Sequence, residues 1–360
     1  MIKYIGSKRT LVPLILDVVQ RVPDVERVVD LFSGTARVGH ALKRAGFRVV
    51  SNDHNAYAYK LAQCYVQADR EDVLAAAAEH IEELSRLPGR AGPFTETYCE
   101  RARFLHPKNG ARIEAIRDEI AARALPEELE AVLLVSLMEA ADRVDSTTGV
   151  QMAFLKKWAP RALRDLELRV PDVLARPARG RCEAMCAEAV DAAAAVDGDL
   201  LYLDPPYNQH NYLGNYHVWE SLVRWDHLPV YGVACKRVDC KERRSAFNSK
   251  PRIRGAVADV LAASRAETVV ASFSDEGYVA REEMEQLLGA MWGGEAHVFT
   301  IATDYKRYVG AQIGIHGPSG ERVGEVGRLR NVEYLFVASR RDLGAALAPL
   351  PFERVAVGAR

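Results

Sequence analysis

Short apolar segments alternate with stretches of helical spacing at the start of the chain. Val28 to Phe32 is apolar and ends at Ser33-Gly34, and Phe47 to Asn52 is a second such segment. An apolar run that ends in a turn is typical of a buried parallel strand. Val38 to Ala45 has helical spacing, and Gly46 follows it as a helix-ending glycine. The pattern therefore predicts a strand–helix–strand unit.

The alternation then stops for more than a hundred residues. From Tyr57 to about Arg179 the apolar positions recur at helical spacing, interrupted by loops at 88–93 and 145–149. This pattern predicts a helical insertion between two strands of a sheet. Its helices are expected at Val73 to Leu87, Ile113 to Ala124, Glu127 to Arg143 and Met152 to Leu166.

Apolar strands return in the second half of the chain. They are expected at Asp199 to Leu203, Thr268 to Phe273, Val298 to Thr303 and Val332 to Ala338. Strands interleaved with helices predict an α/β fold with a doubly wound, mostly parallel sheet. Ligands of such folds bind at the carboxyl ends of the strands, so the residues that follow each strand are the candidates for chemistry.

Composition excludes several protein classes. The 360 residues are 49% hydrophobic and 27% charged, which is ordinary for a globular protein. No apolar run reaches the roughly 18 residues of a membrane helix, and the N-terminus is too polar for a signal peptide, so we expect a cytoplasmic protein with no membrane partner. Six cysteines lack the spacing of zinc ligands, so reduced thiols and no metal are expected.

The first candidate site lies where the first strand turns into a helix. Asp53 follows Gly34 by about 20 residues, the spacing at which an acid accepts hydrogen bonds from both ribose hydroxyls. Phe32 breaks the G-x-G-x-x-G pattern that a dinucleotide requires. A nucleoside without a pyrophosphate fits better, and S-adenosylmethionine is such a ligand. From these residues alone, an ordinary strand–turn–helix is an equal alternative.

The second candidate site is Asp204-Pro205-Pro206-Tyr207, which directly follows an apolar strand. Two prolines remove two backbone donors and stiffen the turn. The Asp204 carboxylate and the Pro205 carbonyl can then accept both hydrogens of an exocyclic amino group, and Tyr207 offers a ring on which a planar base can stack. A rigid loop with a capping aspartate is the structural alternative.

These motifs carry a family resemblance over nearly the whole chain. Residues 3–8 (Lys-Tyr-Ile-Gly-Ser-Lys), the Phe-x-Gly loop, the helical insertion and Asp-Pro-Pro-Tyr follow one another in this order. The chain thereby resembles the alpha group of DNA adenine-N6 methyltransferases, to which the Dam and FokI-type methylases belong. Supporting segments of the FokI-type branch are Thr147 to Val150, Asn215 to His217, Phe247 to Lys250, Ser272 to Gly277 and Tyr305 to Tyr308.

The resemblance implies the roles of particular residues. Cofactor contacts fall on Tyr4, Lys8, Asp30, Phe32, Gly34, Gly39, Asp53, Glu188 and Asp204, and catalysis on Asp204, Pro205 and Tyr207. Tyr4 stands where Dam-type enzymes commonly have Trp, and Glu188 stands where the family often has Asp. The implied cofactor is S-adenosyl-L-methionine, without a metal. The implied fold is a Rossmann-like methyltransferase with a helical insertion for DNA recognition.

Basic residues follow the tetrapeptide, although the net charge is only −1. Between Tyr231 and Arg254 there are eight basic residues and two acidic ones. From composition alone, phosphate binding and an ordinary solvated loop are equal alternatives, and the position of the segment close after the tetrapeptide favours phosphate binding. The candidate DNA-binding residues are Thr147, Thr148, Lys156, Lys157, Lys236, Arg237, Arg243, Arg244, Lys250, Arg252 and Arg254. The expected partners are double-stranded DNA and a cognate restriction nuclease or defence system, with the enzyme acting as a monomer.

These features divide the chain into parts. Residues 1–60 and 180–345 are expected to form the catalytic domain, with a basic DNA-contact loop at 208–254, 61–179 the recognition insertion, and 346–360 a tail. The leading hypothesis is site-specific methylation of a flipped adenine. Amino-methylation of cytosine or RNA is a second reading, and a catalytically silent DNA-binding relative is a third. The intact Asp53, Asp204 and Tyr207 argue against the third.

Overall fold

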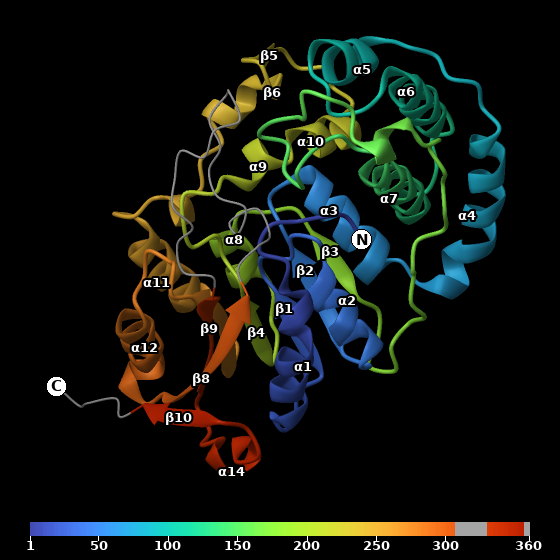
Figure 1. Ribbon diagram of the computed structural model, residues 1–360. Helices are drawn as coiled ribbons and strands as arrows, with labels where there is room; N and C mark the ends of the chain where they lie inside the picture. Colours follow the sequence, from blue (N-terminus) through green and yellow to red (C-terminus); the bar gives the residue numbers. More distant parts are fainter. Residues whose placement is uncertain (307–329, 356–360) are drawn as a thin grey trace. The chain divides into compact units, whose positions relative to one another are not determined.

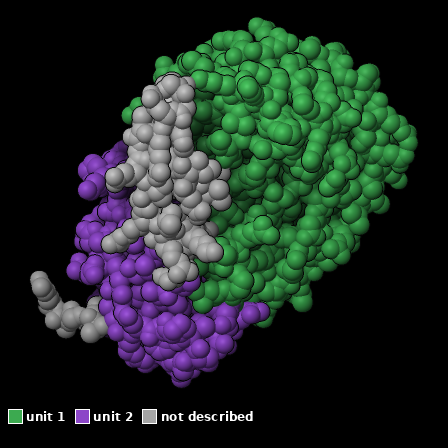
Figure 2. Space-filling model, viewed as in Figure 1, with its two compact units in different colours: residues 1–16, 26–192, 210–244 green, residues 17–25, 193–209, 245–360 purple. Residues whose placement is uncertain are grey.

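The computed structural model describes residues 1–306 and 330–355 in two compact units. Unit 1 consists of residues 1–16, 26–192 and 210–244, and unit 2 of 17–25, 193–209 and 245–360 (Figure 2). The helical insertion clusters with the first strands in unit 1.

The strands of unit 1 are short and parallel. β1 (Arg27–Asp30) pairs in register with β2 (Arg48–Asn52), and β2 pairs with β3 (Glu183–Met185). The last three residues of β1 and the last four of β2 are buried. α2 (Arg37–Arg44) connects β1 to β2, which confirms the predicted strand–helix–strand unit. The sequence pattern did not reveal β3, whose three residues are only half-buried.

The predicted helical insertion lies between β2 and β3 (Figure 1). α7 carries the longest buried face, and α4 and α6 pack against it. The elements of the insertion are α3 (Ala56–Ala62), η2 (Gln63–Gln67), α4 (Arg70–Ser85), α5 (Pro93–Thr95), η3 (Glu96–Arg101), α6 (Pro107–Ala122), α7 (Glu127–Arg143) and η4 (Pro160–Leu163). The helix expected at 152–166 is wrong: only η4 is helical there, and Pro160 begins it.

The other elements of unit 1 lie near its two ends in the sequence. η1 (Lys8–Thr10) precedes α1 (Val12–Arg21), whose second half belongs to unit 2. The C-terminal segment of unit 1 contains α9 (Tyr212–Asn215), α10 (His217–Arg224), β5 (Val230–Tyr231), β6 (Lys236–Arg237) and η5 (Val238–Lys241). β5 and β6 pair as an antiparallel hairpin.

The described residues of unit 2 form five strands in the order β10-β8-β9-β7-β4. β4 and β7 are parallel and buried at every position, whereas β9, β8 and β10 add antiparallel pairs. The strands are β4 (Leu200–Leu203), β7 (Thr268–Ser274), β8 (His297–Lys306), β9 (Arg330–Ser339) and β10 (Phe352–Val355). The other elements are α8 (Ala189–Ala195), which begins in unit 1, η6 (Ala246–Asn248), α11 (Ile253–Ala263), α12 (Arg281–Gly289), η7 (Met291–Gly294) and α14 (Gly344–Leu347).

The structure confirms the α/β class. Every strand expected from the apolar runs is present, within a few residues at its ends, because buried strands leave a continuous apolar signal. Parallel pairs join β1, β2 and β3 in unit 1 and β4 with β7 in unit 2. Among the described residues, no helix is long and apolar enough to cross a membrane.

Candidate active site

Asp53 shapes the loop after β1. The Asp53 Oδ2 atom accepts a hydrogen bond from the Gly34 amide at 3.0 Å, and Oδ1 accepts one from the Asn55 amide at 2.9 Å. Gly34 has φ +50° and Ala36 has φ +57°, so the chain turns sharply before α2. The carboxylate therefore links the end of β2 to the loop that follows β1.

Asp30 and Gly39 support this loop from within the core. Asp30 is 1% exposed, and its Oδ2 accepts the Gly39 amide at 3.1 Å and the Ser51 hydroxyl at 3.4 Å. A Cβ at position 39 would lie 2.4 Å from the Ser51 Oγ atom, so only glycine fits there. Asp30 and Gly39 thus fix the first turn of α2 against β2.

Four tyrosines form an aromatic cluster beside the loop. The Tyr4 ring stacks on Tyr216 with centroids 4.5 Å apart and on Tyr212 at 5.1 Å, and its hydroxyl lies 3.0 Å from that of Tyr57. A Cβ at Gly34 would lie 3.3 Å from the Tyr4 ring. Burial raises the pKa of Tyr4, which keeps its hydroxyl neutral. A side chain at position 34 would therefore press on the Tyr4 ring, and the positive φ of this residue also favours glycine.

Sequence reasoning placed only one of these tyrosines, Tyr4, in the site. Tyr57 and Tyr212 lie far from Tyr4 in the sequence, and nothing in their local patterns links them to it. Tyr216 belongs to a segment that resembles the FokI-type branch, and this was its only signal. Its hydroxyl accepts the Ile5 amide at 2.6 Å, which ties α9–α10 to the N-terminal motif.

The structure also brings Glu188 to the end of β2. Asn52 exchanges two hydrogen bonds with the backbone of Ala187, at 3.0 and 3.1 Å, which fixes the segment after β3. Glu188 is exposed, and its carboxylate lies 3.3 Å from the His54 ring. Lys8 is buried in η1 and Phe32 is half-buried in the loop. These residues all belong to unit 1, as do Tyr4, Asp30 and Asp53.

Burial makes Asp53 unusual for a carboxylate. Desolvation raises its pKa, while His54 and hydrogen bonds from Asn55 and Gly34 oppose the shift. A carboxylate with a raised pKa gains more from a ligand that donates hydrogen bonds to its charged form. Ribose hydroxyls are such donors, so the electrostatics of this position fit the predicted ligand.

The tetrapeptide lies in unit 2, directly after the buried strand β4. Its Tyr207 ring packs against Phe273 of β7, with centroids 5.9 Å apart. The Tyr207 carbonyl oxygen accepts the Tyr278 amide at 2.8 Å. A Cβ at Gly277 would lie 3.0 Å from the Ser274 carbonyl oxygen and 3.4 Å from the Tyr207 Cβ atom. The turn at 274–278 therefore packs closely against the tetrapeptide and holds Tyr207.

A second segment that resembles the family lies against the residues after the tetrapeptide. The Asn248 side chain donates a hydrogen bond to the Asn208 carbonyl oxygen at 2.8 Å. The Tyr278 hydroxyl donates to the Gln209 side chain at 3.2 Å. Two of the segments chosen by resemblance, 247–250 and 272–277, thus converge on this turn. A third, 305–308, lies partly outside the described residues.

Two of the candidate DNA-binding residues are corrected by the structure. Arg237 is 1% exposed, and its guanidinium forms ion pairs with Asp226 at 2.7 Å and with Asp239 at 3.1 Å. Thr147 is 3% exposed and donates its hydroxyl proton to Asp145. Both side chains are buried and engaged, so they hold the unit together instead of facing a phosphate.

Arg243 is half-buried between Glu220 and the backbone of His54. It lies 3.0 Å from the Glu220 carboxylate, which is fully buried and also receives Arg224. The remaining candidates are accessible to a ligand. Lys236 is half-buried, and the exposed residues are Thr148, Lys156, Lys157, Arg244, Lys250, Arg252 and Arg254.

The β5–β6 hairpin is anchored by a buried histidine. The His217 Nε2 atom lies 2.8 Å from the Ala234 carbonyl oxygen, and Nδ1 lies 3.2 Å from that of Gly214. Burial, which the two carbonyls only partly oppose, lowers its pKa to about 4. The folded protein therefore holds His217 neutral at pH values at which an unfolded chain would be protonated.

We expect stability to fall on acidification because of His217. Its contribution is fully present above the unfolded pKa of about 6.5 and is lost as the pH falls towards 4, a total of roughly 3 kcal/mol. His217→Gln, which keeps a neutral donor, should reduce the pH dependence of the free energy of unfolding between pH 6.5 and 4. Urea titrations measure it. In the control His227→Asn, at an exposed histidine, the free energy of unfolding should depend on pH as it does in the wild type. The same pH dependence in both variants would contradict the role assigned to His217.

The fold defines a class of protein: an α/β fold whose candidate site residues follow the carboxyl ends of its parallel strands. Residues 4–286 match the D12 class of N6 adenine-specific DNA methyltransferases. The chain belongs to this family. The resemblance read from the tetrapeptide and the cofactor loop is thereby confirmed.

Three curated relatives are bacterial methylases. The chain is 28% identical to the modification methylase StsI of Streptococcus sanguinis over 79% of the chain and 46% of the relative. It is 29% identical to the methyltransferase M.NlaIII of Neisseria lactamica, over 78% of the chain and 83% of the relative. It is 29% identical to M.FokI of Planomicrobium okeanokoites, over 79% of the chain and 46% of the relative. The alignments thus span about half of StsI and M.FokI but most of M.NlaIII.

Proposed function

We propose that the chain transfers a methyl group from S-adenosyl-L-methionine to the exocyclic amino group of a flipped adenine in double-stranded DNA. The observation that carries this proposal is the Asp-Pro-Pro-Tyr turn, placed after buried β4 and held by the turn at 274–278 in a chain of the N6 adenine family. The three relatives named above are methylases of type II or modification systems, which supports the same chemistry.

The residues of unit 1 fit the nucleoside part of this donor. Asp53 already orders the loop through the Gly34 amide and would accept hydrogen bonds from the ribose. Tyr4 and Lys8 of the N-terminal motif, Asp30, Phe32 and Gly39 shape the remainder, and Glu188 would contact the adenine. S-adenosylmethionine supplies a methyl group activated by its sulfonium. Among the described residues, no group of three potential ligands could hold a metal ion, and the proposed reaction uses none.

Asp204 and Pro205 would act on the amino group of the target. That nitrogen is a poor nucleophile, because its lone pair is delocalised into the ring. Acceptors for both of its hydrogens favour a pyramidal nitrogen and stabilise the positive charge that develops on it. The nitrogen forms its bond to the methyl carbon as the carbon–sulfur bond breaks, and one proton leaves afterwards. Catalysis is mainly positioning.

A base paired inside a duplex cannot enter such a site, so the adenine must flip out. Stacking on Tyr207 would partly offset the few kcal/mol that unstacking costs. Phe273 packs against the Tyr207 ring and the Tyr278 amide holds the Tyr207 backbone, which supports this role. Adenine is favoured over cytosine by the Asp at position 204, where cytosine-amino enzymes more often carry Ser.

Analysis of the methylated product tests the proposed function. Plasmid DNA treated with the protein and S-adenosylmethionine is digested to nucleosides and analysed by mass spectrometry. We expect N6-methyladenine as the dominant product, with none when the donor is omitted. A product dominated by methylcytosine would contradict the target base. Methylation of transfer or ribosomal RNA in place of DNA would contradict the substrate, and binding without transfer would indicate a silent relative.

The exposed basic residues in and before α11 would bind phosphates of the DNA. Neutralising Arg244, Lys250, Arg252 and Arg254 to glutamine should flatten the salt dependence of DNA binding. The slope of log K against log salt falls by about 0.9 for every phosphate that the protein no longer neutralises. Fluorescence anisotropy between low and physiological salt measures this slope. A control that neutralises Arg21, Arg265, Arg340 and Arg341 should keep the slope, and a flatter slope in the control alone would place the DNA elsewhere.

The DNA-contact proposal extends to Thr148, Lys156, Lys157 and Lys236. Lys156 and Lys157 lie beside Trp158, whose ring is covered by Arg103 at 4.3 Å. The helical insertion would supply sequence readout, since direct readout of bases requires side chains that reach a groove. The proposal also includes a cognate restriction nuclease as partner. It places the protein in the cytoplasm and has it act as a monomer.

A further inference from the structure

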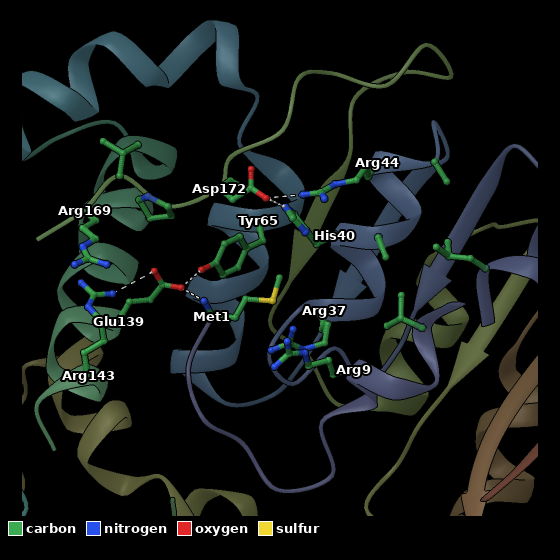
Figure 3. A pocket seen from close by; sticks show the side chains of 16 residues that line it. Met1, Arg9, Arg37, His40, Arg44, Tyr65, Glu139, Arg143, Arg169 and Asp172 are labelled. Carbon is green, nitrogen blue, oxygen red and sulfur yellow. Dashed lines mark hydrogen bonds and ion pairs between the residues drawn. The ribbon is translucent and has the colours of Figure 1, made fainter. Parts of the chain in front are cut away.

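Unit 1 contains a cavity of about 820 Å³ (Figure 3). It is lined by Met1, η1, α1, α2, η2, α7 and the segment 169–172. One part of its lining is apolar and is formed by Val12, Leu16, Ala41, Ala45, Val170 and Pro171. The roles proposed for the nucleoside loop and the tetrapeptide use none of its lining residues. We name it the arginine cavity, after its five arginines: Arg9, Arg37, Arg44, Arg143 and Arg169.

The charges of the arginine cavity do not balance. Five arginines face two carboxylates, Glu139 and Asp172. Asp172 pairs with Arg44, and Glu139 lies 4.0 Å from Arg143. Arg169 pairs with Glu167, a residue beside the cavity, at 2.7 Å. Three arginines therefore already have partners.

Arg9 and Arg37 remain without a carboxylate among the residues that the structure describes. Figure 3 shows their guanidinium groups next to each other. The buried Nε atom of Arg37 has no hydrogen-bond partner within the described residues. Burial, and after it the charge of Arg9, lowers the pKa of Arg37. Two like charges held together with an orphaned donor are costly, and an anion between them removes both costs.

We propose that the arginine cavity binds a phosphorylated ligand of nucleotide size, with a phosphate group between the guanidinium groups of Arg9 and Arg37. A planar guanidinium recognises phosphate in a bidentate manner, and two of them match an anion with at least two charges. The volume lies within the range of small-ligand sites. The apolar part of the lining suits the sugar and base of such a ligand.

A duplex backbone fits the same cavity less well. DNA grooves bind to rows of exposed and unpaired cations, because affinity comes from the release of counterions along several phosphates. Arg44, Arg143 and Arg169 are already paired. Among the described arginines of the cavity, Arg9 and Arg37 are left to bind an anion. Two cations suit one compact phosphate group better than a row of phosphodiesters.

The position of the pair suggests what its occupation does. Arg9 directly follows buried Lys8 in η1, and Arg37 directly follows the loop and begins α2. η1 and α2 are in contact. A phosphate held by both arginines would tie together the two segments to which the proposed function assigns S-adenosylmethionine. We therefore expect phosphate and cofactor to strengthen each other's binding, a consequence that rests on the proposed function.

Calorimetry with inorganic pyrophosphate and with uridine triphosphate tests the site. A uridine nucleotide is chosen because adenosine could enter the cofactor site. We expect both probes to bind the wild type, uridine triphosphate more tightly, and Arg9→Gln and Arg37→Gln each to weaken binding at least about tenfold. Arg86→Gln is the matched control and should bind as the wild type does, because Arg86 is an exposed arginine directly after α4 and outside the cavity.

Three results would overturn the site. Neither probe binds at millimolar concentration, both cavity variants bind the probes as tightly as the wild type does, or a bound probe is displaced by duplex DNA alone. Thermal melting without ligand guards against misfolding. Arg37→Gln should melt no lower than the wild type, because it removes a like-charge repulsion, and a lower melting temperature would instead show a structural role. Arg9 is exposed, so Arg9→Gln tests the site without disturbing the core.

The coupling has its own measurement. The affinity for S-adenosylmethionine should rise when pyrophosphate is present, and Arg9→Gln should abolish the increase. The coupling would be overturned if pyrophosphate did not change the affinity for S-adenosylmethionine. The phosphate site itself would still stand if pyrophosphate binding depended on Arg9 and Arg37. Absence of S-adenosylmethionine binding in every variant would instead count against the proposed function.

Discussion

Replacing Asp204 by alanine is expected to lower the rate of methyl transfer at least about a hundredfold, while the affinity for duplex DNA changes little. In the proposed reaction the carboxylate would stabilise the positive charge that develops on the amino nitrogen, and removal of one such preorganised group typically costs a factor of about 100 to 1,000. The proposed phosphate contacts are made by other residues. Single-turnover transfer of a radiolabelled methyl group measures the chemical step, and fluorescence anisotropy measures DNA binding.

Two further variants sharpen this test. Asp204→Asn keeps an acceptor oxygen but loses the charge, so it should retain more activity than the alanine variant. Asp259→Asn, at an exposed position of α11 in the same unit, should transfer at the wild-type rate. Near-normal turnover by Asp204→Ala would remove the tetrapeptide from the reaction.

Replacing Asp53 by alanine is expected to weaken the binding of S-adenosylmethionine at least about tenfold. Hydrogen bonds to a charged group contribute roughly 1.5–3 kcal/mol, and the ribose would donate to this carboxylate. The variant also loses the acceptor of the Gly34 amide, so the loop itself is less ordered. Isothermal titration calorimetry with S-adenosylmethionine measures the affinity.

Three comparisons separate a cofactor role from a general loss of structure. Circular dichroism should show the same secondary structure in Asp53→Ala as in the wild type. Asp191→Asn, exposed in α8, should leave cofactor affinity unchanged. Glu188→Gln should lower the affinity for S-adenosylmethionine less than Asp53→Ala does, because Glu188 is exposed whereas Asp53 is half-buried. Unchanged affinity in Asp53→Ala would exclude the carboxylate from the site.

Much of the candidate site could be predicted because its signals are local. β4 is four buried residues followed at once by the tetrapeptide, so strand, turn and acceptors are adjacent in the sequence. The loop after β1 and Asp53 are separate, but the regular alternation of strand and helix sets the distance between them. The hydrogen bond from the Gly34 amide to Asp53 confirms that the spacing brings them together.

The errors arose where a local pattern has two physical outcomes. Arg237 looked like a phosphate ligand in a basic segment, but Asp226 and Asp239 neutralise it within the core. Residues 152–166 have helical spacing, yet the structure forms only one short turn there, at 160–163. Charge and periodicity describe a residue's preference, whereas burial depends on which distant residues pack on it.

The sequence by itself determined the α/β class, the order of the motifs, the family and the candidate acceptors, because strand burial and turn chemistry are encoded over a few adjacent residues. Only the tertiary structure decided which side chains surround them. The stack of Tyr4 on Tyr212 and Tyr216 and the juxtaposition of Arg9 and Arg37 join segments that are distant along the chain. Such contacts follow from the packing of whole elements, and no local pattern specifies them.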